Sequence, residues 1–124
     1  MEESNRPTRT AELIAGYAAE KSAENVVILD MSRVSGICDF FVICSASSSV
    51  RAKTIAENIE VRMRSGGQRP IHRDGQKEGK WIVIDFGDVV AHVFLEETRK
   101  YYNLENLWGD APHRQFHAHP ALKD

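Results

Sequence analysis

Two short apolar stretches in the second half of the chain constrain its fold more than any other feature. Residues 80–86 and 89–95 are two mostly apolar runs, and Gly87 and Asp88 stand between them. After Lys80, every second position of each run is apolar throughout, while the positions between are mixed. A period of two is typical of β-strands, and a short connection containing glycine is typical of a β-hairpin. We therefore predict two neighbouring antiparallel strands here.

Alternation also divides each predicted strand into two faces. One face is wholly apolar and is expected to lie in the core: Ile82, Ile84, Phe86, Val89, Ala91, Val93 and Leu95. The other face mixes aromatic, aliphatic and ionisable side chains: Trp81, Val83, Asp85, Val90, His92 and Phe94. A large aromatic group beside polar groups is typical of a protein interface. The alternative is that a helix covers this face and that His92 simply bonds a backbone carbonyl.

The other predicted elements complete a single α/β domain. Helical periodicity and β-branched runs predict helices over 10–22, from after Ser49 to about Arg64, and over 96–102, with strands over 26–29, 39–44 and 68–73. Pro70 favours an edge position for the last of these strands, and residues 104–108 can add one more helical turn. The order α-β-β-α-β-β-β-α predicts a mixed sheet of about five strands with three helices and two parallel crossovers.

Three helices cannot cover both faces of such a sheet, so we expect part of one face to be bare. Residues 1–9 and 112–124 lack a periodic pattern and are predicted to be flexible termini, which leaves 10–111 as the domain.

The charge distribution limits the classes of partner. The chain of 124 residues has a net charge of −2, which argues against RNA or DNA as the main contact. Residues 51–80 carry eight bases and four acids, whereas residues 81–110 carry six acids and two bases. The acidic segment also holds aromatic residues, so it suits a basic protein partner. No apolar run reaches the length of a membrane span or forms a signal-peptide core, so we expect a cytoplasmic protein.

The two cysteines fit a reducing compartment. Cys38 and Cys44 flank a predicted strand, and six extended residues separate their Cα atoms by roughly 20 Å, too far for a disulfide. We expect each to be a small, buried or half-buried residue without activation.

Three motifs could carry chemistry, and each has a simpler explanation. Ser47–Ser49 open a helix and could bind phosphate, but the glycine-rich loop and lysine of a P-loop are missing, so capping is favoured. Asp85 and Asp88 could hold Mg²⁺, but their spacing puts them at opposite ends of a tight turn. The tail histidines His113, His117 and His119 could bind zinc, but only adventitiously without a rigid frame. We therefore expect no catalytic residue, cofactor or metal.

The chain resembles one family, the ribosomal silencing factors (RsfS, Iojap-like), from about residue 10 to residue 111. Four blocks carry the resemblance: Val27–Asp30, Asp39–Ile43, Trp81–Phe94 and Arg99–Ala111. The family often has Tyr at the position of Phe40 and Gly near Ala46, and the histidine-bearing tail lies outside the resemblance.

The resemblance implies a regulatory protein and not an enzyme. Its fold would be similar to that of nucleotidyltransferases, without their catalytic motif. Such proteins dock on the large-subunit ribosomal protein numbered fourteen, block joining of the small subunit, and so repress translation when nutrients are scarce. They commonly form homodimers.

Seven residues of the matching blocks are the expected partner-binding residues: Trp81, Asp85, Asp88, His92, Tyr102, Leu107 and Trp108. Leu107 and Trp108 could instead belong to the core or to a dimer contact. Two other hypotheses stay open at this point. One is an Mg²⁺-dependent nucleotidyltransferase-like enzyme that uses Asp85 and Asp88, and the other is a plain dimerisation module.

Overall fold

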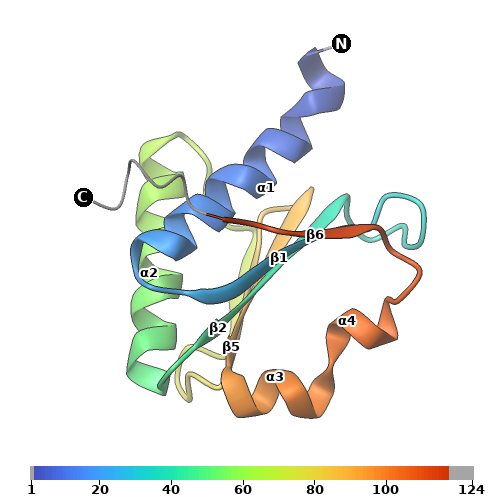
Figure 1. The fold of residues 1–124 in the computed structure, drawn as a ribbon. Coiled ribbons are helices and arrows are strands. Elements are labelled where there is room, and N and C mark those ends of the chain that lie inside the picture. Colours follow the sequence, from blue (N-terminus) through green and yellow to red (C-terminus); the bar gives the residue numbers. More distant parts are fainter. Residues whose placement is uncertain (1, 118–124) are drawn as a thin grey trace.

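The protein folds into a mixed α/β domain built on one six-stranded sheet (Figure 1). The structure is a computed structural model that describes residues 2–117. Its strands are β1 (Glu24–Asp30), β2 (Phe40–Ala46), β3 (His72–Asp74), β4 (Trp81–Asp85), β5 (Val89–Leu95) and β6 (His113–Gln115). Its helices are α1 (Glu2–Glu20), α2 (Ser49–Ser65), α3 (Glu96–Tyr102) and α4 (Leu104–Leu107). The predicted fold class is confirmed, with α4 as the additional helical turn.

The strand order is β3-β4-β5-β2-β1-β6. β4 and β5 form the predicted hairpin, with Val83 opposite His92. β3 is an edge strand as predicted, but it is shorter than the expected strand over 68–73 and begins after Pro70. The expectation of two parallel crossovers is wrong, because β2 and β5 are parallel but β1 pairs with β2 in the antiparallel sense. The reason is the short connection over residues 31–39: antiparallel neighbours need only a loop, whereas a parallel pair needs a crossover of a dozen or more residues.

Both ends of the domain extend beyond the predicted boundaries. α1 begins at Glu2, although its buried apolar residues begin only near Ala11. In the segment predicted to be a flexible tail, His113–Gln115 form β6, which pairs antiparallel with β1 and raises the strand number from five to six. All three side chains of β6 are exposed, so the strand has no apolar alternation that the sequence could have revealed. The predictions for residues 1 and 118–124 lie outside the described residues.

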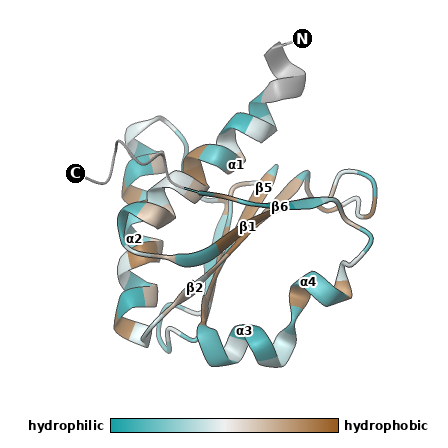
Figure 2. Cartoon of the chain, viewed as in Figure 1, coloured by the Kyte–Doolittle hydropathy of each residue, from teal (hydrophilic) through white to brown (hydrophobic). Residues whose placement is uncertain are grey.

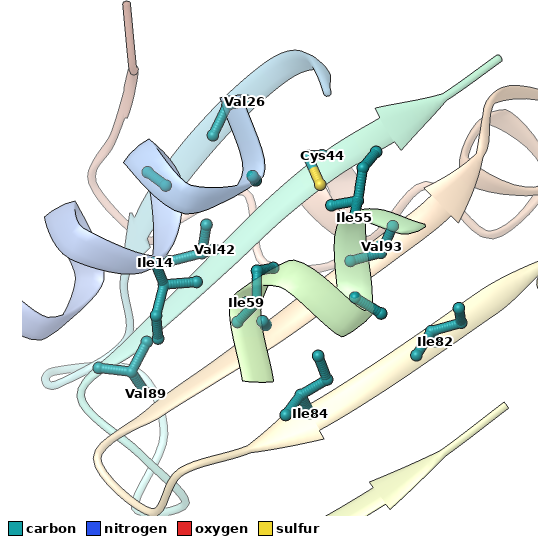
Figure 3. Close-up of a cluster of buried hydrophobic side chains, with 14 of the residues drawn as sticks. Ile14, Val26, Val42, Cys44, Ile55, Ile59, Ile82, Ile84, Val89 and Val93 are labelled. Carbon is teal, nitrogen blue, oxygen red and sulfur yellow. The ribbon is translucent and has the colours of Figure 1, made fainter. Parts of the chain in front are cut away.

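The main core lies between the sheet and the pair α1 and α2 (Figure 3). Ile14 of α1 and Ile59 of α2 lie over Val42, Val89 and neighbouring strand residues. The face predicted to be core is confirmed, since its central members are at most 1% exposed: Ile82, Ile84, Val89, Ala91 and Val93. Phe86 and Leu95, at the strand ends, are half-buried.

The opposite face of the sheet is only partly covered. α3 and α4 lie away from α1 and α2 (Figure 1). A second apolar cluster includes Ile43 and Phe94 of the sheet and Leu104 of α4. Hydropathy follows the same division, with brown central strands and a mostly teal and white α3 (Figure 2). On β4 this face stays half-exposed. We expected part of one face to be bare, because three helices cannot cover both faces of the sheet.

The serines before α2 cap the helix. Ser48 is the N-cap residue, and its Oγ accepts a hydrogen bond from the Arg51 backbone N–H at 3.1 Å. We expect Ser48→Ala to lower the free energy of unfolding by about 1 kcal/mol, because a helix-end N–H loses its partner. Ser47→Ala, at the exposed residue one position earlier, is the control and should change it by less than about 0.5 kcal/mol. Urea denaturation of both variants measures the difference, and equal losses would contradict the capping role.

Candidate docking surface

The half-exposed side of β4 gathers several of the predicted partner-binding residues. We define the Trp81 face as Trp81, Val83 and Asp85 of β4 together with Tyr102 of α3. The three β4 side chains alternate with the fully buried Ile82 and Ile84, so they point to the sheet face opposite α1 and α2. Tyr102 is 51% exposed and its ring lies 4.8 Å from the Trp81 ring, between centroids. Residues far apart in the sequence therefore form one surface.

Trp81 is held between aromatic neighbours. Its indole stacks on Phe94, the residue opposite it on β5, with 4.9 Å between centroids and 26° between planes. Its Nε1–H donates a hydrogen bond to Nδ1 of His92 at 3.1 Å. The polar atom of the indole is thus satisfied inside the protein, and the exposed part of the ring offers apolar area.

His92 is buried and lies behind this surface instead of on it. It is 6% exposed, and the ring of Phe41 meets it edge-on at 4.5 Å. Burial lowers the pKa of His92 to about 4, so the ring is neutral at physiological pH. With 6% of its surface exposed, His92 offers little area for direct contact with a partner, and such contact stays a prediction. The alternative, that His92 bonds a backbone carbonyl, is wrong, because Nδ1 of His92 accepts its hydrogen bond from the Trp81 indole.

Carboxylates gather where β4 ends and where β2 and β5 begin. Asp85 is half-buried and its Oδ1 accepts from the Gly87 N–H at 2.7 Å, which is the turn-stabilising role. Asp88 is exposed, and its backbone carbonyl accepts from the N–H groups of Asp39 and Phe40. Burial, together with the charges of Asp39, Asp85 and Asp88, raises the pKa of the Cys38 thiol to about 11. This end of the surface is therefore electronegative, and Cys38 is an unreactive thiol there.

The side chains of this cluster do not have the arrangement of metal ligands. Within residues 2–117, no group of three His, Cys, Asp or Glu side chains is placed to hold a metal ion. His113 lies on the edge strand β6 and His117 is exposed, whereas His119 is outside the described residues. Cys44 is a core residue, and burial raises its thiol pKa to about 12.

The last two predicted residues differ in their surroundings. Leu107 of α4 is 67% exposed, so it is available for contact. Trp108 is half-buried against the second apolar cluster, with its ring edge-on to Phe41 at 6.4 Å. The alternative that these two residues belong to the core therefore fits Trp108 but does not fit Leu107.

Several exposed apolar residues lie outside the predicted set, and Tyr101, Ile71 and Ile37 are among them. Tyr101 is 82% exposed and its ring meets that of Tyr102 at 5.0 Å. Ile71 and Ile37 are also strongly exposed, and the Ile71 N–H bonds the carbonyl of Asp85, which places it beside the Trp81 face. An isoleucine in a polar segment between turns was the signal that could have revealed Ile71.

A groove adjoins Trp81. It has a volume of about 490 Å³ and lies between the β3–β4 connection and α3. Asp74, Glu78, Lys80, Trp81 and Tyr102 are among its lining residues. Aromatic walls with charged groups at the rim can receive a side chain of a partner protein.

The helices of residues 2–117 include none that is long and apolar enough to cross a membrane.

Comparison with known proteins gives one consistent result. Residues 3–123 match the family model described as "Ribosomal silencing factor during starvation". The chain is 40% identical over 100 residues to the ribosomal silencing factor RsfS of Bacillus subtilis, covering 81% of this chain and 85% of that protein. It is 42% identical over 101 residues to RsfS of Halalkalibacterium halodurans, covering 82% and 86%. A crystal structure of a Chromobacterium violaceum protein superposes with a TM-score of 0.81 at 26% identity, covering 82% of this chain and 85% of that chain.

Proposed function

Since this chain belongs to the ribosomal silencing factor family, we propose that it represses translation by binding the large ribosomal subunit and blocking its joining to the small subunit. Subunit joining needs a large complementary contact. A rigid folded domain bound on the joining surface prevents that contact by occupying its volume, so no chemical step is required. In this proposal the protein is a cytoplasmic regulator and not an enzyme.

The observation that carries the proposal is the half-exposed Trp81 on a partly uncovered sheet face. An aromatic ring supported from behind, with a groove at its side, has the properties of an interface hot spot. The proposed partner is the ribosomal protein numbered fourteen of the large subunit. The carboxylates of Asp85 and Asp88 at one end of the surface would attract a basic ribosomal protein and fix its orientation.

A second copy of the chain is the other partner that we propose. The exposed apolar side chains of Tyr101 and Leu107, on α3 and α4, offer area for a homodimer. Sedimentation equilibrium of a Leu107→Lys variant would show whether this area holds two copies together.

The main test is Trp81→Ala. We expect this variant to bind purified large subunits about 100-fold more weakly, because hot-spot aromatic residues contribute about 2–4 kcal/mol. Sucrose-gradient co-sedimentation measures the binding, and light scattering of mixed subunits measures joining, which the variant should no longer inhibit. Val61→Ala is the matched control, since Val61 is an exposed apolar residue of α2 that should leave binding unchanged.

A second variant covers the case in which Trp81→Ala is poorly folded. Asp88→Lys changes an exposed side chain. The N–H groups of Asp39 and Phe40 bond the backbone carbonyl of residue 88, which the substitution leaves in place. Charge reversal there should weaken co-sedimentation, and added salt should reduce the difference from the wild type. Normal co-sedimentation of folded Trp81→Ala would disprove the proposed surface.

A further inference from the structure

The ring nitrogens of His92 are in unusual surroundings for a core residue. Nδ1 accepts the hydrogen bond from the Trp81 indole, so the proton of the neutral ring is on Nε2. Nε2 is the only buried side-chain nitrogen or oxygen without a hydrogen-bond partner in the part of the chain that the structure describes. A buried N–H without an acceptor lowers the stability of the fold.

Packing alone does not require histidine at this position. The ring contacts the aromatic rings of Phe41, Trp81 and Phe94, and the residue opposite it on β4 is Val83. A leucine or phenylalanine would suit these apolar neighbours and would leave no polar atom unpaired. The only favourable polar contact of the side chain is the bond to Trp81, so a function for His92 has to be sought there.

That bond fixes the position of an exposed binding group. Phe94 supports the Trp81 ring on one side and Tyr102 lies beside it, but neither bonds its N–H. The His92 acceptor fixes the rotation of the indole and keeps its N–H turned inward. A group that is already ordered before binding loses less conformational entropy when a partner docks.

We propose that His92 is a positioning residue for docking, whose Nδ1 holds the Trp81 indole in its binding orientation without touching the partner. This inference rests on the proposed function, because it concerns the same surface. No charged group is among the ring contacts named above, and burial keeps the pKa of His92 near 4, so the acceptor is present throughout the physiological pH range.

A matched pair of variants isolates the acceptor. Asparagine and leucine have the same number of side-chain heavy atoms, branched at Cγ, but only the Oδ1 of asparagine can accept a hydrogen bond at the position of Nδ1. We expect His92→Leu to weaken co-sedimentation with large subunits about tenfold, and His92→Asn to restore most of that loss, because the effect of one hydrogen bond is of this order. His92→Phe is a second variant without an acceptor and keeps the ring volume.

Nuclear magnetic resonance of the free protein provides a readout that does not depend on the ribosome. The Trp81 indole N–H signal should exchange slowly with solvent in the wild type and in His92→Asn, and faster in His92→Leu and His92→Phe. Trp108→Phe identifies which of the two indole signals belongs to Trp81. The wild-type imidazole should show the tautomer with the proton on Nε2.

The outcomes separate this inference from the proposed function. If folded Trp81→Ala binds normally, the proposed surface is wrong. If Trp81→Ala binds weakly but His92→Leu and His92→Asn bind equally well, the surface stands and the positioning role is overturned. In a Trp81→Phe background, which has no indole N–H, the two His92 variants should bind equally; a persistent difference would also overturn the positioning role.

Discussion

Arg99→Met should lower the free energy of unfolding by about 3 kcal/mol, because it breaks a partly buried ion pair and leaves the buried partners of the guanidinium without a donor. The Arg99 guanidinium is almost completely buried. It donates to the backbone carbonyl of Asn25 at 2.7 Å, to Ser45 Oγ at 2.8 Å and to Glu105 Oε2 at 2.6 Å. Methionine replaces the apolar stem of arginine but ends before the guanidinium position and has no hydrogen-bond donor. Chemical denaturation of the purified variant measures the loss.

The neighbouring residue offers a control for Arg99→Met. Lys100 forms an ion pair with Glu96 in which both side chains are well exposed, at 3.7 Å. Lys100→Met should therefore change the free energy of unfolding by less than about 0.5 kcal/mol. Adding Glu105→Leu to Arg99→Met should recover part of the stability, since it removes the unpaired carboxylate. Equal effects of the Arg99 and Lys100 variants would contradict a special role for the buried guanidinium.

Arg99 also connects the fold to the docking surface. Its bonds join α3 to β1, β2 and α4, and Tyr102, at the end of α3, lies beside Trp81. Loosening this network should therefore disturb the Tyr102 side of the Trp81 face as well as the stability.

The elements that the sequence predicted well are those with strong periodicity. The hairpin faces of β4 and β5 follow the alternation of apolar residues, and α3 has the predicted bounds, Glu96–Tyr102. β6 was missed because three polar residues form a strand only by pairing with β1, and pairing between distant segments has no local pattern. The direction of β1 relative to β2 depends on the length of their connection, which periodicity does not describe.

Side-chain roles at the candidate site could be predicted only in part. Alternation placed Trp81 and Asp85 on the mixed face, and they lie there, half-exposed. The same alternation placed His92 on that face but could not show that Phe41 and Trp81 would bury it. Arg99 entered the sequence analysis only as the first residue of a matching block, without a structural role. Its bonds to Asn25 and Ser45 come from strands 74 and 54 residues earlier, so only the tertiary structure reveals them.

Burial of a neutral His92 should make stability fall steeply in mild acid. Its pKa is lowered from 6.5 to about 4 in the folded protein, so between these values the unfolded chain binds a proton that the native state does not. The free energy of unfolding therefore rises with pH across this window. Well above pH 6.5 the ring is neutral in both states and imposes no penalty. The full loss, reached near pH 4, is about 3 kcal/mol, because one pKa unit corresponds to about 1.4 kcal/mol.

His92→Phe is the variant that isolates this contribution, since it keeps an aromatic ring and removes the titrating group. Urea denaturation of the wild type and the variant at several pH values from 4 to 7.5 should give curves that diverge as the pH falls, with the wild type losing more stability. His72→Gln, at an exposed histidine of β3, should leave the wild-type decline in place. Parallel curves for the wild type and His92→Phe would contradict a buried neutral ring. In that case the hydrogen bond that orders Trp81 would also be in doubt, because both conclusions depend on an unprotonated Nδ1 that faces the indole.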